Sequence, residues 1–68
     1  MDETNEDSDE KRAFDNYEKG IDAERHGKMK EALDFYTLAM IIDHSKNQQY
    51  IDAVKRIETI ISERHPQK

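Results

Sequence analysis

The segment of residues 28–43, KMKEALDFYTLAMIID, carries apolar side chains on two sides of a helix. The wider stripe follows helical spacing and consists of Met29, Ala32, Leu33, Tyr36, Ala39 and Met40. The second stripe consists of Phe35, Leu38 and Ile42. A helix that is apolar all round is buried between neighbours. We therefore predict that this segment is the central helix, with the preceding helix against one side and a third helix against the other.

The preceding helix is predicted over residues 9–26. Its residues Phe14, Tyr17 and Ile21 lie at positions i, i+3 and i+7, which places them on one face. Gly20 interrupts the pattern, although glycine inside a helix costs about 1 kcal/mol relative to alanine. This cost indicates that another helix crosses closely at Gly20. Gly27 is predicted to end the helix, because glycine most easily adopts the left-handed conformation of a terminating residue.

The third helix is predicted over residues 46–65. Ser45 is followed by Gln48 three residues later, which is the pattern of a capping box, and Pro66 ends the helix. The main apolar stripe of this helix consists of Tyr50, Val54, Ile57 and Ile61. Because links of a few residues make neighbouring helices antiparallel, the predicted fold class is all-α, an antiparallel three-helix bundle in which a helical hairpin packs with a third helix.

Charge is distributed unevenly along the chain. Residues 1–10 hold six acidic residues and no basic one, whereas residues 11–68 hold ten acidic and eleven basic residues, and the whole chain has a net charge of −5. An acidic segment whose single apolar residue is Met1 is typical of disorder. We predict a disordered acidic tail over residues 1–8, a three-helix domain over 9–65 and a C-terminal tail over 66–68. The acidity argues against nucleic acid as a partner.

No pattern of catalytic residues stands out. The chain has no cysteine, no glycine-rich phosphate loop and no HExxH sequence, and its three histidines fall at the ends of different predicted elements. No apolar stretch approaches the roughly 20 residues needed to cross a membrane. We expect a protein that is not an enzyme, binds no cofactor or metal, does not insert into membranes and is cytoplasmic. The sequence leaves its oligomeric state open.

The spacing of small and aromatic residues in the first two helices resembles a known family. Gly20 in the first helix is followed by Ala32, Tyr36 and Ala39, which match an A-x-x-x-F/Y-x-x-A pattern in the second. Residues 13–46 therefore resemble one tetratricopeptide repeat, whose small residues allow close helix packing. The resemblance implies a protein-binding module in which the third helix caps the repeat.

A second family fits the same region. The pattern G-x-x-x-E-A-L-x-x-Y-x-x-A, carried here by Gly27, Glu31, Ala32, Leu33, Tyr36 and Ala39, is similar to the second helix of the microtubule-interacting and trafficking (MIT) domain. This resemblance implies a three-helix domain of ESCRT-linked membrane-trafficking machinery. A three-helix bundle related to neither family also stays open.

Each resemblance implies its own binding residues. In the tetratricopeptide family, peptides lie along the face of the first helices, which implies contacts from Tyr17, Ile21, Glu24 and Arg25. In the MIT family, partners lie beside the third helix, which implies Tyr50, Val54, Arg56 and Ile57. We therefore predict a non-enzymatic adaptor that docks a short segment of a partner protein or peptide. A small structural subunit of a larger assembly is the alternative from another class.

Overall fold

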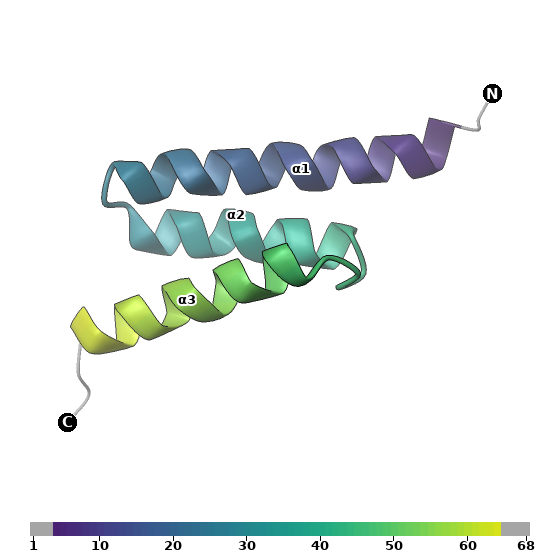
Figure 1. Cartoon of the computed structure of the whole chain (residues 1–68). Helices are drawn as coiled ribbons and strands as arrows, with labels where there is room; N and C mark the ends of the chain where they lie inside the picture. Colours follow the sequence, from purple (N-terminus) through teal and green to yellow (C-terminus); the bar gives the residue numbers. More distant parts are fainter. Residues whose placement is uncertain (1–3, 65–68) are drawn as a thin grey trace.

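A computed structural model describes residues 4–64 of the chain and consists of three α-helices (Figure 1). They are α1 (Thr4–Arg25), α2 (Met29–Ile42) and α3 (Gln48–Arg64). Helices α1 and α2 form an antiparallel hairpin, and α3 runs back across α2 (Figure 1). The predicted all-α bundle of three helices is confirmed. Among the described residues, none of the helices combines the length and the apolar character needed to span a bilayer.

The first helix begins earlier than the sequence predicts. Residues 4–8, predicted as part of a disordered tail, belong to α1. Acidic residue types are favourable near a helix N-terminus because they complement the backbone dipole, so the acidic start of the chain is compatible with a helix. Residues 1–3 and 65–68 lie outside the described residues, and so does Pro66. The tails predicted there stay predictions.

Gly27 ends α1 in the predicted way. Its φ angle is +76°, in the left-handed region. The N–H of Lys28 donates to the carbonyl oxygen of Ala23 at 2.9 Å, and the N–H of Gly27 donates to that of Glu24 at 3.0 Å. These two bonds form a Schellman motif, which satisfies carbonyl groups at the helix end and turns the chain into α2.

The predicted capping box at the start of α3 is wrong. Ser45 follows His44 in a left-handed turn, with φ angles of 58° and 57°, and α3 begins only at Gln48. The buried carboxylate of Asp43 accepts a hydrogen bond from the backbone N–H of Asn47 at 2.8 Å instead. The turn is tightened by a bond from the N–H of Ser45 to the carbonyl oxygen of Met40. A side chain at the end of α2 therefore fixes the start of α3.

The hairpin packs closely around Gly20, as the sequence predicts. A Cβ atom at Gly20 would lie 2.6 Å from the ring of Tyr36, and Tyr36 is 0% exposed. Three alanines on the same seam, Ala13, Ala32 and Ala39, are also fully buried. Small residues therefore let α1 and α2 approach, and the ring of Tyr36 fills the space opposite Gly20.

Helix α3 completes the core from one side of the hairpin. Its residues Tyr50, Ala53, Val54 and Ile57 are buried, and Ile57 is 0% exposed. Met29 and Leu33 of α2 and Ile60 and Ile61 of α3 pack around this core. We call the side of the hairpin under α3 the covered side, and the opposite side the open side.

Candidate functional site

A polar network on the covered side joins all three helices. Glu24 of α1 accepts a hydrogen bond from the hydroxyl of Tyr36 of α2 at 2.7 Å. The guanidinium of Arg56 of α3 donates to both oxygens of the same carboxylate at 3.0 Å each. Burial, followed by the hydrogen bond to Glu24, raises the pKa of Tyr36 to about 12. A bidentate Arg–carboxylate pair is geometrically specific, so this network fixes how α3 sits on the hairpin.

Aromatic contacts reinforce the covered side. The ring of Tyr17 lies 5.0 Å from that of Tyr50 and 5.5 Å from that of Tyr36, measured between centroids. These separations are in the range in which aromatic pairs attract. Burial, followed by the charge of Asp43, raises the pKa of Tyr50. The three rings therefore tie α1, α2 and α3 together near the middle of the molecule.

The structure brings the two sets of binding residues that the resemblances imply together on the covered side, where Tyr17 lies 5.0 Å from Tyr50 between ring centroids. Tyr50, Val54 and Ile57 are buried against the hairpin, so they hold α3 in place and do not line an open groove. Their role as partner contacts stays a prediction, and the stripe that they form is the one that α3 uses to pack against the hairpin. Arg56 is half-exposed, and its guanidinium is bound to Glu24.

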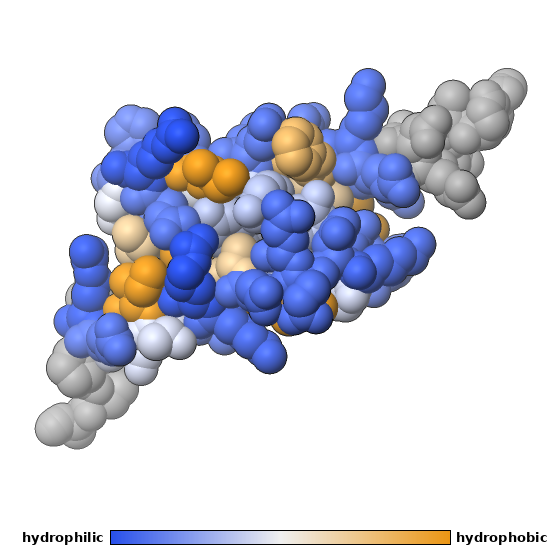
Figure 2. Space-filling model, in the orientation of Figure 1, coloured by the Kyte–Doolittle hydropathy of each residue, from blue (hydrophilic) through white to orange (hydrophobic). Residues whose placement is uncertain are grey.

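The α1 residues implied by the tetratricopeptide resemblance lie nearer the surface. Tyr17 and Ile21 are half-buried and pack against the core, and Arg25 is exposed. Phe14 is on the same face, is 48% exposed and lies 6.4 Å from Tyr17 between ring centroids. Figure 2 shows this view of the molecule as mostly hydrophilic, with separate hydrophobic areas over α1. Tyr17, Ile21 and Arg25 therefore share one face of α1, but the apolar surface there is interrupted.

The open side carries an apolar surface formed by the second stripe of α2, which the sequence predicts to be core, together with Ile41. The second stripe of α2 was predicted to lie under the third helix, but α1 and α3 share the first stripe. As a result, Leu38 is 45% exposed and its neighbour Ile41 is 59% exposed. Phe35 and Ile42 are partly buried. We call these four residues of α2 the α2 ridge.

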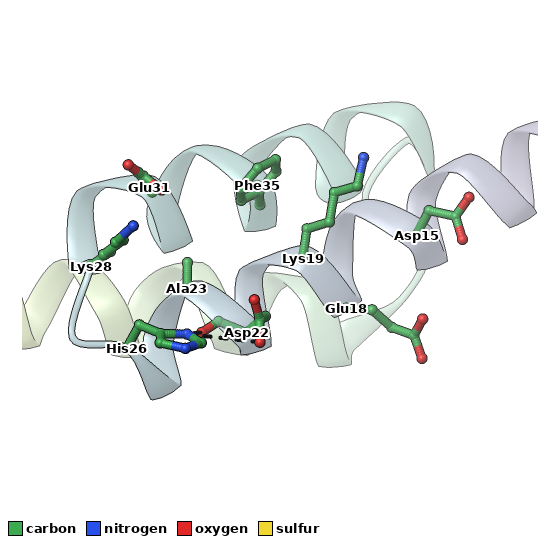
Figure 3. Close-up of a pocket in the computed structure, with 9 residues that line it drawn as sticks. All are labelled: Asp15, Glu18, Lys19, Asp22, Ala23, His26, Lys28, Glu31 and Phe35. Atoms are coloured by element: carbon green, nitrogen blue, oxygen red, sulfur yellow. Dashed lines mark hydrogen bonds and ion pairs between the residues drawn. The ribbon is translucent and has the colours of Figure 1, made fainter.

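A groove between α1 and α2 continues the α2 ridge (Figure 3). Its volume is about 480 Å³, and Phe35 and Ala23 lie at its centre, from facing helices. The charged residues around them are Asp15, Glu18, Lys19 and Asp22 of α1 together with Lys28 and Glu31 at the start of α2. His26 completes the lining, with its Nδ1 atom 2.8 Å from the backbone oxygen of Asp22. We call this hollow the hairpin groove.

The hairpin groove is apolar at its floor and acidic around its rim. Four carboxylates and two lysines line it, and no residue of α3 does. Within residues 9–64, no three His, Cys, Asp or Glu residues are placed to hold a metal ion together. In the sequence, the second stripe of α2 is the signal for this surface. Only the structure shows that α3 packs elsewhere and leaves this stripe uncovered.

Comparisons of the chain with protein-family models, curated proteins and solved structures find no significant match.

Proposed function

We propose that the protein is a non-enzymatic protein-interaction module whose docking surface is the α2 ridge together with the hairpin groove. The observation that carries this proposal is the exposure of Leu38 and Ile41 beside Phe35 on a side of the hairpin that α3 leaves open. Apolar side chains that are adjacent on a surface mark partner sites more often than isolated ones do. These residues follow i, i+3 spacing, so they form one continuous row along α2.

The covered side supports this role by making the hairpin a rigid platform. The network of Tyr36, Glu24 and Arg56 holds the three helices together without using the α2 ridge. Residues on a helix that is fixed from behind keep their positions when a partner binds, which lowers the entropic cost of binding.

Both resemblances agree with a protein-binding role, although each implies a different binding surface. Tetratricopeptide-like and MIT-like modules are protein-binding domains, and a three-helix arrangement fits either. A docking role therefore does not depend on which resemblance holds, whereas membrane trafficking would follow only from the second. A permanent place in a larger assembly would use the same exposed apolar surface and would differ in the rate of dissociation.

The test compares two exposed apolar residues on opposite sides of the hairpin. Leu38 and Phe14 are similarly exposed, at 45% and 48%, so Leu38→Ser and Phe14→Ser remove comparable surface. Each variant and the wild type are used to capture proteins from extracts of cells that express the chain, with bound proteins quantified by mass spectrometry. We expect a protein that Leu38→Ser loses and Phe14→Ser retains.

Two results would count against the proposal. If both variants retain every captured protein, the α2 ridge is not the docking surface. If Phe14→Ser loses the partner and Leu38→Ser keeps it, binding takes place on the α1 face that includes Tyr17 and Ile21. Helical circular dichroism of each variant checks that the fold is intact.

A further inference from the structure

The way in which the hairpin binds its own third helix indicates what the open side would accept. On the covered side, an apolar stripe of α3 that includes Ile57 packs against the hairpin, and Arg56 beside the stripe pairs with a carboxylate of α1. The occupant of the covered side is thus an amphipathic helix with a basic residue at its edge.

The open side repeats these features, and no helix among residues 4–64 occupies it. The α2 ridge and the hairpin groove provide an adjoining apolar surface that includes Phe35 and Leu38. Asp15 and Asp22 of α1 stand at the rim, where Glu24 stands on the covered side. The groove lining has twice as many carboxylates as lysines, so a positively charged edge would complement it.

A second copy of the chain fits this surface poorly. In a two-fold symmetric dimer the same patch faces itself, so the acidic rim would meet another acidic rim. The exposed part of the α2 ridge is also small, on the order of a few hundred Å², whereas a stable interface buries about 800 Å² on each partner. A single short helix needs less area than a folded domain does, because it can lie in the groove and along the ridge.

We infer that the open side binds a short amphipathic helix of another protein, with apolar residues on the α2 ridge and lysine or arginine facing Asp15 and Asp22. This inference rests on the proposed function, because it names the chemistry of the partner for the same surface. Since the partner itself is unidentified, designed peptides serve as probes.

The experiment uses two synthetic helical peptides of about 15 residues, a length at which a helix is marginal alone and can be ordered by binding. Both carry the same leucines at helical spacing. One has lysine at the edges of the apolar face, and the other has glutamate there. Each is titrated into the isotope-labelled full chain, and backbone amide shifts are followed by NMR. We expect the lysine peptide to cause saturable shifts around Ala23, Phe35 and Leu38, with affinity at least about tenfold above that of the glutamate peptide.

Matched charge variants separate the acidic rim from the general acidity of the chain. The double variant Asp15→Asn, Asp22→Asn removes two carboxylates at the hairpin groove. We expect it to lower the affinity for the lysine peptide roughly three- to tenfold. Asp52→Asn with Glu58→Gln removes two exposed carboxylates of α3 and is expected to leave affinity nearly unchanged.

Each other outcome is decisive. The two peptides could bind equally well, with binding lost in Leu38→Ser but kept in the groove charge variant. This result would contradict the inference that the partner is basic, but it would still support the open side as the docking surface. The inference of a basic helix would also be contradicted if both charge variants weakened peptide binding equally, if the shifts were confined to α3, or if neither peptide bound. Shifts on the open side that appear with protein concentration alone would show that a second copy is the occupant. The proposed function itself is decided separately, by the capture experiment with Leu38→Ser and Phe14→Ser.

Discussion

The covered and open sides of the α1–α2 hairpin contain similar residue types in different surroundings. On the covered side, apolar residues such as Leu33 meet those of α3, and Glu24 and Arg56 close the contact with an ion pair. On the open side, Leu38 and Ile41 reach solvent, and the carboxylates of Asp15 and Asp22 have no helix across from them. Within residues 4–64, one further helix packs on the hairpin, and it covers only one of the hairpin's two sides.

This difference divides the molecule into residues that determine the fold and residues that are available for binding. Burial of apolar surface on the covered side contributes to the free energy of unfolding, whereas Leu38 and Ile41 on the open side keep about half of their surface in water after folding. Substitutions on the two sides are therefore expected to differ in their effect on stability, even when the residue types are the same.

The largest effect is expected at Ile57, which lies at the centre of the covered side and is 0% exposed. Ile57→Ala removes buried methyl and methylene groups and leaves a cavity, which should cost about 3 kcal/mol. A domain of this size has little stability to lose, so the variant should be substantially unfolded at room temperature. Urea denaturation followed by helical circular dichroism measures the change. Ile57→Val is the graded control, with an expected cost of about 1 kcal/mol, and equal stability of both variants would show that the site is not a packed core.

A second test of the covered side uses pH. The pKa of Tyr36, about 12, lies above the ordinary tyrosine value near 10, because burial and the hydrogen bond to Glu24 favour the neutral hydroxyl. The contribution of this group to stability is therefore fully present below about pH 10 and is lost as the pH rises through about 12. The free energy of unfolding should fall by on the order of 2 kcal/mol over this range.

The measurement compares the wild type with Tyr36→Phe in urea denaturation across this pH range. The hydroxyl of Tyr36 is absent from the variant, so its stability should fall less steeply with pH. Parallel curves for the two proteins would mean that Tyr36 ionises as freely in the folded state as in the unfolded one. Phenolate absorbance during the same titration reports whether one tyrosine ionises late.

A smaller loss of stability is expected when a side chain is added at the close contact within the hairpin. Gly20→Ala gains about 1 kcal/mol of helix propensity but places a methyl group 2.6 Å from the fully buried ring of Tyr36. Overpacking a core costs about 1–3 kcal/mol, so the net loss should be about 1 kcal/mol. Thermal denaturation measures it, with Lys19→Ala at the exposed neighbouring position as the control. A Gly20→Ala protein more stable than the wild type would show that the ring of Tyr36 yields easily.

The sequence predicts much of the covered side because its signals are local. Glycine in a helical pattern indicates the close crossing at Gly20, glycine after the pattern indicates the turn at Gly27, and apolar spacing indicates three helices. The start of α3 is not predicted, because the cap comes from Asp43, within the preceding turn, and not from Ser45. Which residue caps α3 depends on the left-handed backbone at His44 and Ser45. The spacing of residue types in the sequence does not reveal that conformation.

The open side is not predictable in the same way. Periodicity identifies the second stripe of α2 as apolar, but it does not say which neighbour covers each stripe. The two stripes of α2 adjoin around the helix, so α1 and α3 can share the first and leave Leu38 exposed. The position of α3 rests on the burial of its own apolar stripe, which includes Ile57, and on contacts between residues far apart in the chain, such as Arg56 with Glu24, 32 positions away. Such long-range contacts cannot be read from the local spacing of α2.

The smallest effect on stability is expected on the open side, at Ile41, the counterpart of Ile57. The same substitution, Ile41→Ala, removes a side chain that is 59% exposed and leaves no cavity. Alanine also has the higher helix propensity, so stability should change by no more than about 0.5 kcal/mol in either direction. The urea denaturation used for Ile57→Ala measures this change under identical conditions. A loss approaching that of Ile57→Ala would mean that Ile41 is buried in solution, and the side that we describe as open would then already be occupied.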